Sequence, residues 1–336
     1  MRPRSLPLAA LLPVIAALVA APPVRAATDD PLALVPADAV AVGVVRLAEL
    51  RSNPLSARLF NDVDKGIVDG DAARFLEEAN LNPKQDVDVV VVAGSPKDSE
   101  HGDGLILFQG RFEPERLAAA VVLRGGTRKS APDGDYFLLP DKGKGDGKGD
   151  GKVKPHHAGA VAFVSPKLVM AGPEASVRKA LADRAAGGTG FAKGAGIGRE
   201  RSRIDRKAVI WALADSSRLP QREPKEGASD AASGIVAAMR SVTFLVFQAV
   251  PKADGLTLSA TGLSTSADTR DNLEDTLRGI LAIWRLASQE KSPELVPVLR
   301  TFRVEKNREG VTVSGTLPGA VLKAMAEKKK GHADQK

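Results

Sequence analysis

The stretch KLVMAGPEASVRKALAD, residues 167–183, has a counterpart of the same design in VTVSGTLPGAVLKAMAE, residues 311–327. Each begins with a short apolar strand pattern, passes through a Gly/Pro turn, and continues with leucine or methionine at the spacing of an amphipathic helix. The same strand–turn–helix unit also occurs within residues 86–122 and 240–288, and a further strand precedes it each time. Hairpins that alternate with helices predict an antiparallel sheet covered by helices.

The four units form two pairs, and each pair is opened by an additional strand pattern. These opening strands are AVAVGVV at residues 39–45 and KAVIWALAD at residues 207–215. Residues 37–186 and 207–330 are therefore predicted to be two tandem βα-ββα-ββα repeats, joined by a linker at residues 187–206. The predicted fold class is α+β, with one mainly antiparallel sheet in each repeat and helices packed on one face.

Two strands of the second repeat alternate apolar residues with hydroxyl residues, which is typical of a sheet with one covered face and one wet face. Such a wet face is a candidate surface for a partner. Its predicted members are Thr257, Ser259, Thr261, Thr312, Ser314 and Thr316.

A long helix is predicted from residue 267 onward, with Ser266 as its N-cap. Its apolar positions follow helical spacing: Leu273, Leu277, Ile280, Leu281 and Trp284. Because this apolar face is unusually wide, the helix is expected to pack between the two repeats. Trp211 and Trp284 are both expected in the core.

The first 26 residues have the order of a secretory signal peptide. Arg2 and Arg4 precede an apolar run at residues 6–21, and Val24-Arg25-Ala26 resembles a cleavage site. The segment predicts an exported protein, periplasmic or extracellular, with an uncleaved anchor as the alternative. No later segment reaches the roughly 20 apolar residues of a membrane span. The sequence contains no cysteine, which excludes disulfides and attachment of lipid to cysteine.

The charge balance is mildly basic, at +7 over the whole sequence, and three of these charges are arginines of the first 26 residues. Aromatic residues make up only 4%, whereas binders of single-stranded nucleic acid use aromatic stacking platforms. No nucleic-acid partner is therefore predicted. The linker carries a basic cluster that is either solvated or in contact with an acidic envelope polymer, lipid headgroups or an acidic protein. Its members are Arg199, Arg201, Arg203, Arg206 and Lys207.

Two segments are too polar and too simple in composition to form a core. Residues 141–157 form a Gly/Lys/Asp loop that is predicted to be disordered, and residues 331–336 form a tail. His156 and His157 lie in this loop, where a Gly-rich chain offers no fixed metal geometry. With no cysteine, and with all four histidines in loops or the tail, the sequence predicts no catalytic residue, no metal site and no cofactor.

The phrase LVPADAVAVGVV, which contains Pro36-Ala37-Asp38-Ala39, and the later restart RKAVIWALAD frame the two repeats. In these two segments the chain resembles a group of exported bacterial proteins of unknown function, whose duplicated α+β domains begin after a P-A-D-A motif. The resemblance implies the fold and an exported location, and it supplies no active-site residue.

These observations favour a non-enzymatic exported protein that binds or scaffolds an envelope protein or polymer. One alternative is an envelope hydrolase whose residues are assembled between the repeats. Another is a module that sequesters an apolar ligand in a cavity between the repeats, beside the long helix. The sequence does not indicate the oligomeric state.

Overall fold

The computed structural model describes residues 29–52, 71–96, 104–140, 159–188, 190–219, 240–253 and 255–321. The predicted signal peptide, the loop at residues 141–157 and the tail at residues 331–336 lie outside these ranges. All four histidines also lie outside them.

The described strands form a single sheet of 12 strands in which every neighbouring pair is antiparallel. The strands of the first half are β1 (Ala41–Arg46), β2 (Val87–Gly94), β3 (Leu105–Gly110), β4 (Thr127–Ala131), β5 (Gly134–Leu138), β6 (Gly159–Ser165) and β7 (Leu168–Pro173). Those of the second half are β8 (Ile210–Asp215), β9 (Phe244–Lys252), β10 (Gly255–Leu263), β11 (Arg303–Lys306) and β12 (Gly310–Pro318). Their order across the sheet is β11-β12-β10-β9-β8-β1-β2-β3-β7-β6-β5-β4.

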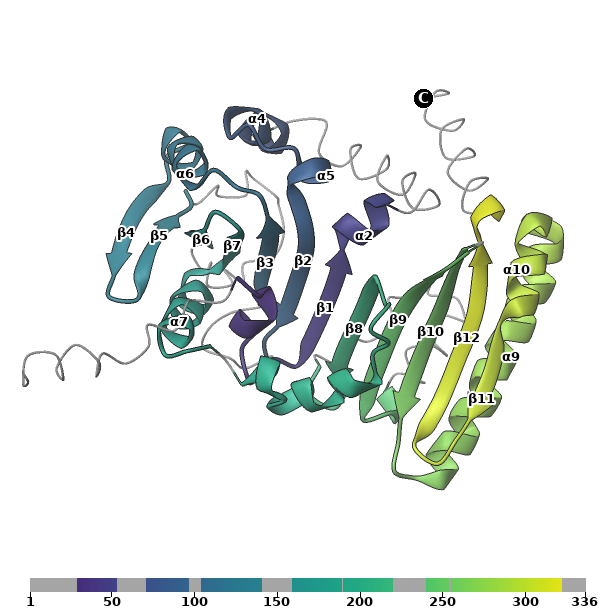
Figure 1. Cartoon of the computed structure of the whole chain (residues 1–336). Coiled ribbons are helices and arrows are strands. Elements are labelled where there is room, and N and C mark those ends of the chain that lie inside the picture. The colour runs from purple at the N-terminus through teal and green to yellow at the C-terminus, as the bar shows by residue number, and fades with distance from the viewer. Residues whose placement is uncertain are drawn as a thin grey trace, which may run out of the picture.

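The expectation of two separate sheets is wrong, because β1 and β8 pair with each other in the middle (Figure 1). These are the two strands that open the predicted repeats. An isolated sheet in each half would leave one edge of β1 and one edge of β8 with unpaired backbone groups. Their antiparallel pairing, with Val44 opposite Trp211, satisfies both edges at once.

Helices connect the strands and cover parts of both faces of the sheet. The α-helices are α2 (Leu47–Ser52), α4 (Asp71–Glu78), α5 (Pro83–Asp86), α6 (Pro114–Leu123), α7 (Glu174–Ala185), α9 (Ala267–Lys291) and α10 (Val296–Thr301). The 3-10 helices are η2 (Pro31–Leu34), η3 (Phe191–Lys193), η4 (Gly196–Arg203) and η5 (Pro293–Leu295).

The two faces are named here after one residue each. Val44, Trp211 and Leu213 point to the Trp211 face, and Val92 and Phe247 point to the opposite Phe247 face, as strand alternation and the pairing register require. On the Trp211 face, the core includes residues of α7, η2, η3 and η4. The predicted linker is part of this core, since Phe191 is fully buried.

The Phe247 face is covered in two places, by different helices in each half. In the first half, α6 packs Leu117 and Val121 onto the sheet, and α4 adds Phe75 at the edge of the same cluster. In the second half, α9 packs onto the face formed by β9 to β12. Helices therefore cover both faces, and the expectation of a single covered face is wrong.

The long helix α9 begins as predicted, because the Ser266 hydroxyl accepts a hydrogen bond from the Thr269 amide at 3.2 Å. Its apolar stripe buries Leu273, Ile280 and Leu281. The helix packs within the second half rather than between the halves, and Trp284 stays 44% exposed instead of entering the core. The fold is thus α+β, built on one large antiparallel sheet.

Candidate functional site

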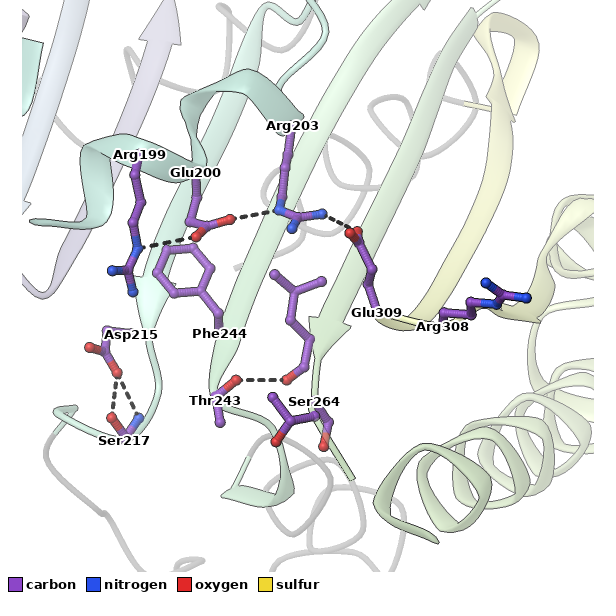
Figure 2. A pocket seen from close by; sticks show the side chains of 12 residues that line it. Arg199, Glu200, Arg203, Asp215, Ser217, Thr243, Phe244, Ser264, Arg308 and Glu309 are labelled. Atoms are coloured by element: carbon purple, nitrogen blue, oxygen red, sulfur yellow. Dashed lines mark hydrogen bonds and ion pairs between the residues drawn. The ribbon is translucent and has the colours of Figure 1, made fainter. Parts of the chain in front are cut away.

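A charged pocket lies at one end of the strands of the second half (Figure 2). It encloses about 450 Å³ between η4, the end of β8, the start of β9 and the turn from β11 to β12. Arg203 joins two of these elements, since its guanidinium donates to Glu200 Oε2 and to Glu309 Oε2 at 2.6 Å each. Asp215 accepts from the Ser217 hydroxyl at 2.5 Å. The carboxylates of the pocket are thus engaged in structural contacts.

The electrostatics of this pocket follow from the same contacts. The hydrogen bond to Glu309, followed by the one to Glu200, raises the pKa of the Arg203 guanidinium above its usual range. Arg199 lies at the rim, with its Nε 3.3 Å from Glu200 Oε1. Cationic and anionic side chains alternate along the wall, so the pocket does not present the uniform positive potential that attracts a polyanion.

The five basic residues predicted to contact a polyanion are not gathered in one patch. Arg199 and Arg203 line the charged pocket. Arg201 turns back into the fold, where it donates to the Ala192 carbonyl at 3.1 Å and lies over the Phe191 ring at 5.7 Å. Arg206 and Lys207 are exposed in the turn before β8.

The six predicted hydroxyl residues do lie together, on the Trp211 face of β10 and β12. They form three directly opposed pairs: Thr257 with Thr316, Ser259 with Ser314, and Thr261 with Thr312. All six are partly exposed. The hydroxyls of Thr261 and Thr312 are 2.9 Å apart and hydrogen-bonded, so this pair partly satisfies itself.

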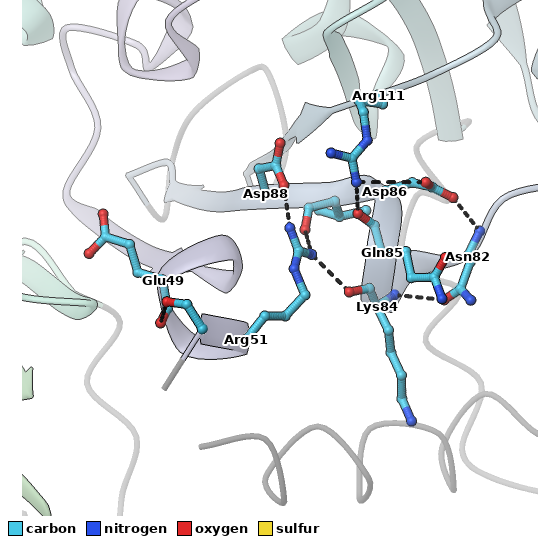
Figure 3. A network of polar contacts seen from close by, with 10 residues as sticks. Glu49, Arg51, Asn82, Lys84, Gln85, Asp86, Asp88 and Arg111 are labelled. Carbon is cyan, nitrogen blue, oxygen red and sulfur yellow. Dashed lines mark hydrogen bonds and ion pairs between the residues drawn. The ribbon is translucent and has the colours of Figure 1, made fainter. Parts of the chain in front are cut away.

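A polar network fixes α2 and α5 against β2 (Figure 3). Arg51 is its centre: its guanidinium donates to the carbonyls of Lys84 at 2.8 Å and Val87 at 2.6 Å, and it also pairs with Asp88. Asp86 accepts from the Asn82 amide at 2.8 Å. Because its members bind each other and the backbone, the network acts as a support for the short helix α5.

Next to that support lies an apolar cavity of about 510 Å³, between α4, α6 and the Phe247 face of the first half. Among the described residues, no polar side chain contributes to its wall. The lining residues are Phe75, Leu76, Leu81, Pro83, Val87, Phe108, Phe112, Leu117, Val121, Leu139, Val161, Phe163, Val169 and Ala171. This space is called the α6 cavity below.

An ion pair ties together the two helices that border the α6 cavity. Arg124 follows α6 and donates from Nε to Glu78 Oε2, in the last turn of α4, at 2.8 Å. Its guanidinium carbon also lies 5.8 Å from the ring centre of Phe75, which lines the cavity. The hydrogen bond from Arg124 lowers the pKa of the Glu78 carboxyl. This contact is called the Glu78–Arg124 latch below.

The α6 cavity was not predicted from the sequence. Of the 10 phenylalanines in the chain, Phe75, Phe108, Phe112 and Phe163 all line it. They come from α4, β3, the loop after β3, and β6, so no single local pattern predicts that all four converge.

Two negative results limit the chemistry of the described residues. Within the described ranges, no three His, Cys, Asp or Glu side chains are placed to hold a metal ion. Over the same residues, no helix has both the length and the apolar character needed to cross a membrane.

No family model matches this chain, and no curated protein matches it. Among solved structures, the chain is similar to TP0453 in several crystal forms. Crystal form I is 10% identical with a TM-score of 0.48, covering 90% of this chain and 99% of that one. Crystal form III is 10% identical with a TM-score of 0.47, covering 90% and 100%. Likeness at this level carries no inference about the chemistry of this chain.

Proposed function

We propose that this protein is an exported, non-enzymatic binding protein whose ligand is apolar. The observation that carries the proposal is the α6 cavity of about 510 Å³ with its wholly apolar wall. Protein interiors are close-packed, and voids larger than a water molecule are few. A cavity within about 300–1,000 Å³ is of the size that holds small molecules, and an apolar wall offers no hydrogen bond to keep water inside.

Export and the internal duplication belong to the same proposal. Export is supported by the signal-like order of residues 1–26. Two tandem βα-ββα-ββα repeats, derived from one ancestral unit, are supported by the mirrored strand order around the β1–β8 pair. A protein exported without disulfides relies on its core for stability, so a large unfilled space inside that core favours a ligand.

A scaffold role is the second candidate, and the hydroxyl face of β10 and β12 favours it. Three opposed Thr/Ser pairs give a flat, partly exposed surface that can hydrogen-bond to an envelope protein or polymer. The hydrolase alternative has less support. The carboxylates of the charged pocket are held by Arg203 and Ser217, and the pocket is built from the linker and the second half rather than from both repeats.

The proposal is tested with a fluorescent fatty acid, cis-parinaric acid, which becomes bright in an apolar environment. The wild-type protein is expected to bind it saturably. Ala171→Phe places a ring in the α6 cavity and is expected to remove the probe-binding site in that cavity, measured as a lower number of probe molecules bound per protein. Ala185→Phe adds the same ring at the exposed end of α7 and is expected to have no effect.

Folding of both variants is checked by their thermal unfolding midpoints. If Ala171→Phe does not fold, Leu139→Trp replaces it, since Leu139 lines the cavity but is 39% exposed and tolerates a larger side chain. Absence of saturable binding by the wild-type protein would reject the proposal. Unchanged binding by a folded cavity-filling variant would also reject it.

A further inference from the structure

A second apolar cavity lies under α9, on the same face of the sheet as the α6 cavity. It encloses about 290 Å³, and Leu273 and Leu277 form its roof. Its floor is made of strands β9, β10 and β12. The floor residues that point to the Phe247 face are Leu245, Phe247, Ala260, Gly262, Val311 and Val313. This space is called the α9 cavity below.

One row of directly opposed residues connects the two cavities across the sheet. It begins at Ala171, which lines the α6 cavity, and ends at Ala260 and Val313, which line the α9 cavity. In order, the row is Ala171, Ile106, Val92, Gly43, Ala212, Phe247, Ala260 and Val313. It contains no charged residue and no side chain that forms hydrogen bonds.

The middle of this row is open rather than packed. Val92 is 49% exposed, and Ile106 and Phe247 are each 38% exposed. At Gly43, a Cβ atom would meet nothing within 4 Å. Single exposed apolar residues are common on protein surfaces, whereas contiguous apolar patches often mark binding sites. The row is therefore the floor of an apolar groove that joins both cavities.

The flank of helix α9 that faces away from α10 adds further apolar surface beside the groove. Arg285 of α9 donates to the carbonyls of Leu299 and Phe302, so its side of the helix faces α10. Ile283 is two positions earlier, which is about 200° around a helix of 3.6 residues per turn. Ile283 therefore lies on the opposite flank, toward the middle of the sheet, and it is 54% exposed.

We propose that the groove binds one lipid with two hydrocarbon chains, with one chain in each cavity and the junction of the chains above Gly43. This inference rests on the proposed apolar-ligand function and specifies the ligand. The uncharged floor complements hydrocarbon and offers nothing to the polar rim of a protein partner. Two separate cavities at the ends of one groove match two chains that diverge from one point.

The dimensions agree with this ligand. Phe108 on β3 lines the α6 cavity, and Phe247 on β9 lines the α9 cavity. Strands β2, β1 and β8 lie between β3 and β9 in the sheet. At ~4.8 Å per strand, each cavity edge is ~10 Å from Gly43 on β1. A lipid chain spans half of a hydrocarbon core of ~30 Å, which is ~15 Å. Each chain therefore reaches into its cavity.

The test counts lipids bound to the full mature chain by native mass spectrometry. The protein is incubated either with vesicles of dioleoyl phosphatidylcholine or with monooleoyl lysophosphatidylcholine, and is then separated from free lipid. One two-chain lipid or two single-chain lipids per protein are expected. Ala260→Phe fills the α9 cavity and is expected to reduce the single-chain count from two to one.

Gly43→Trp is the decisive variant, because it divides the groove without entering either cavity. It is expected to keep two single-chain lipids and to weaken binding of the two-chain lipid at least tenfold. Glu305→Trp adds the same side chain at an exposed position of β11 on the opposite face, and it is expected to leave the binding of both kinds of lipid unchanged. A wild-type count of one single-chain lipid, unaffected by Ala260→Phe, would overturn this inference and leave the proposed function standing. No bound lipid of either kind, together with no binding of cis-parinaric acid, would overturn both.

Discussion

Val44 of β1 lies directly opposite Trp211 of β8, and both side chains are buried in a core that contains residues of both halves. The pair lies where the halves meet, so the stability of each half depends on the other. A chain that reads as two repeats is therefore expected to unfold as one cooperative unit.

The two tryptophans of the chain provide a matched test of this coupling. Trp211→Ala is expected to lower the free energy of unfolding by about 3–5 kcal/mol, because it leaves a cavity at the junction. The Trp284 side chain on α9 is 44% exposed. Trp284→Ala is therefore expected to lower the free energy of unfolding by about 1 kcal/mol or less. Urea unfolding measures both values. Equal losses, or separate transitions for the two halves of the wild-type protein, would contradict the shared core.

The Glu78–Arg124 latch predicts that entry of the probe into the α6 cavity depends on pH. Arg124, and more weakly Arg74, lower the pKa of Glu78, so the charged pair stabilises the closed helices above the ordinary pKa of a glutamate. This contribution is lost as the pH falls from about 4.3 through the lowered value. The rate at which cis-parinaric acid enters is therefore expected to rise below about pH 4.3.

Two variants distinguish the effect of the latch from a general destabilisation of the fold at low pH. Glu78→Gln is expected to admit the probe quickly at neutral pH, with little further change on acidification. Glu77→Gln, at the exposed neighbouring position, is expected to keep the wild-type pH profile. Identical profiles for all three proteins would show that the latch does not control entry.

Arg203 and Glu309 are 106 positions apart in the sequence, and their contact clamps η4 to the turn between β11 and β12. A double-mutant cycle with Arg203→Ala and Glu309→Ala is expected to give a coupling energy of about 0.2–1 kcal/mol, because both side chains are partly exposed. The coupling should shrink in about 1 M salt, where the Debye length is about 3 Å. A coupling that salt leaves unchanged would point to packing rather than to an ion pair.

Two glycines of the sheet are expected to respond oppositely to the same substitution. At Gly315, a Cβ atom would lie 2.4 Å from the Phe302 ring, so Gly315→Ala should cost about 1–3 kcal/mol through overpacking. At Gly43, a Cβ atom meets open space, so Gly43→Ala should be neutral or slightly stabilising. Thermal unfolding of both variants checks this prediction. A costly Gly43→Ala would show that the groove floor is covered.

Local patterns account for most of the elements that were predicted correctly. The N-cap at Ser266 and the alternation of apolar and hydroxyl residues along β10 and β12 follow from spacings of a few residues. Trp284 was placed wrongly because helical periodicity reports which face of α9 is apolar, and it does not report how far the sheet extends beneath that face.

The sequence by itself determined the α+β class, the hairpins, and the helices α6, α7 and α9 that follow three of them, because side-chain alternation and turn residues act over short distances along the chain. Only the tertiary structure decided that β1 pairs with β8, that helices cover both faces, and that four phenylalanines spread over residues 75–163 line one cavity. These features depend on which strand edges and apolar faces meet in space. The free energy of these tertiary contacts comes from residues far apart in the chain, and short sequence patterns do not specify which of them come together.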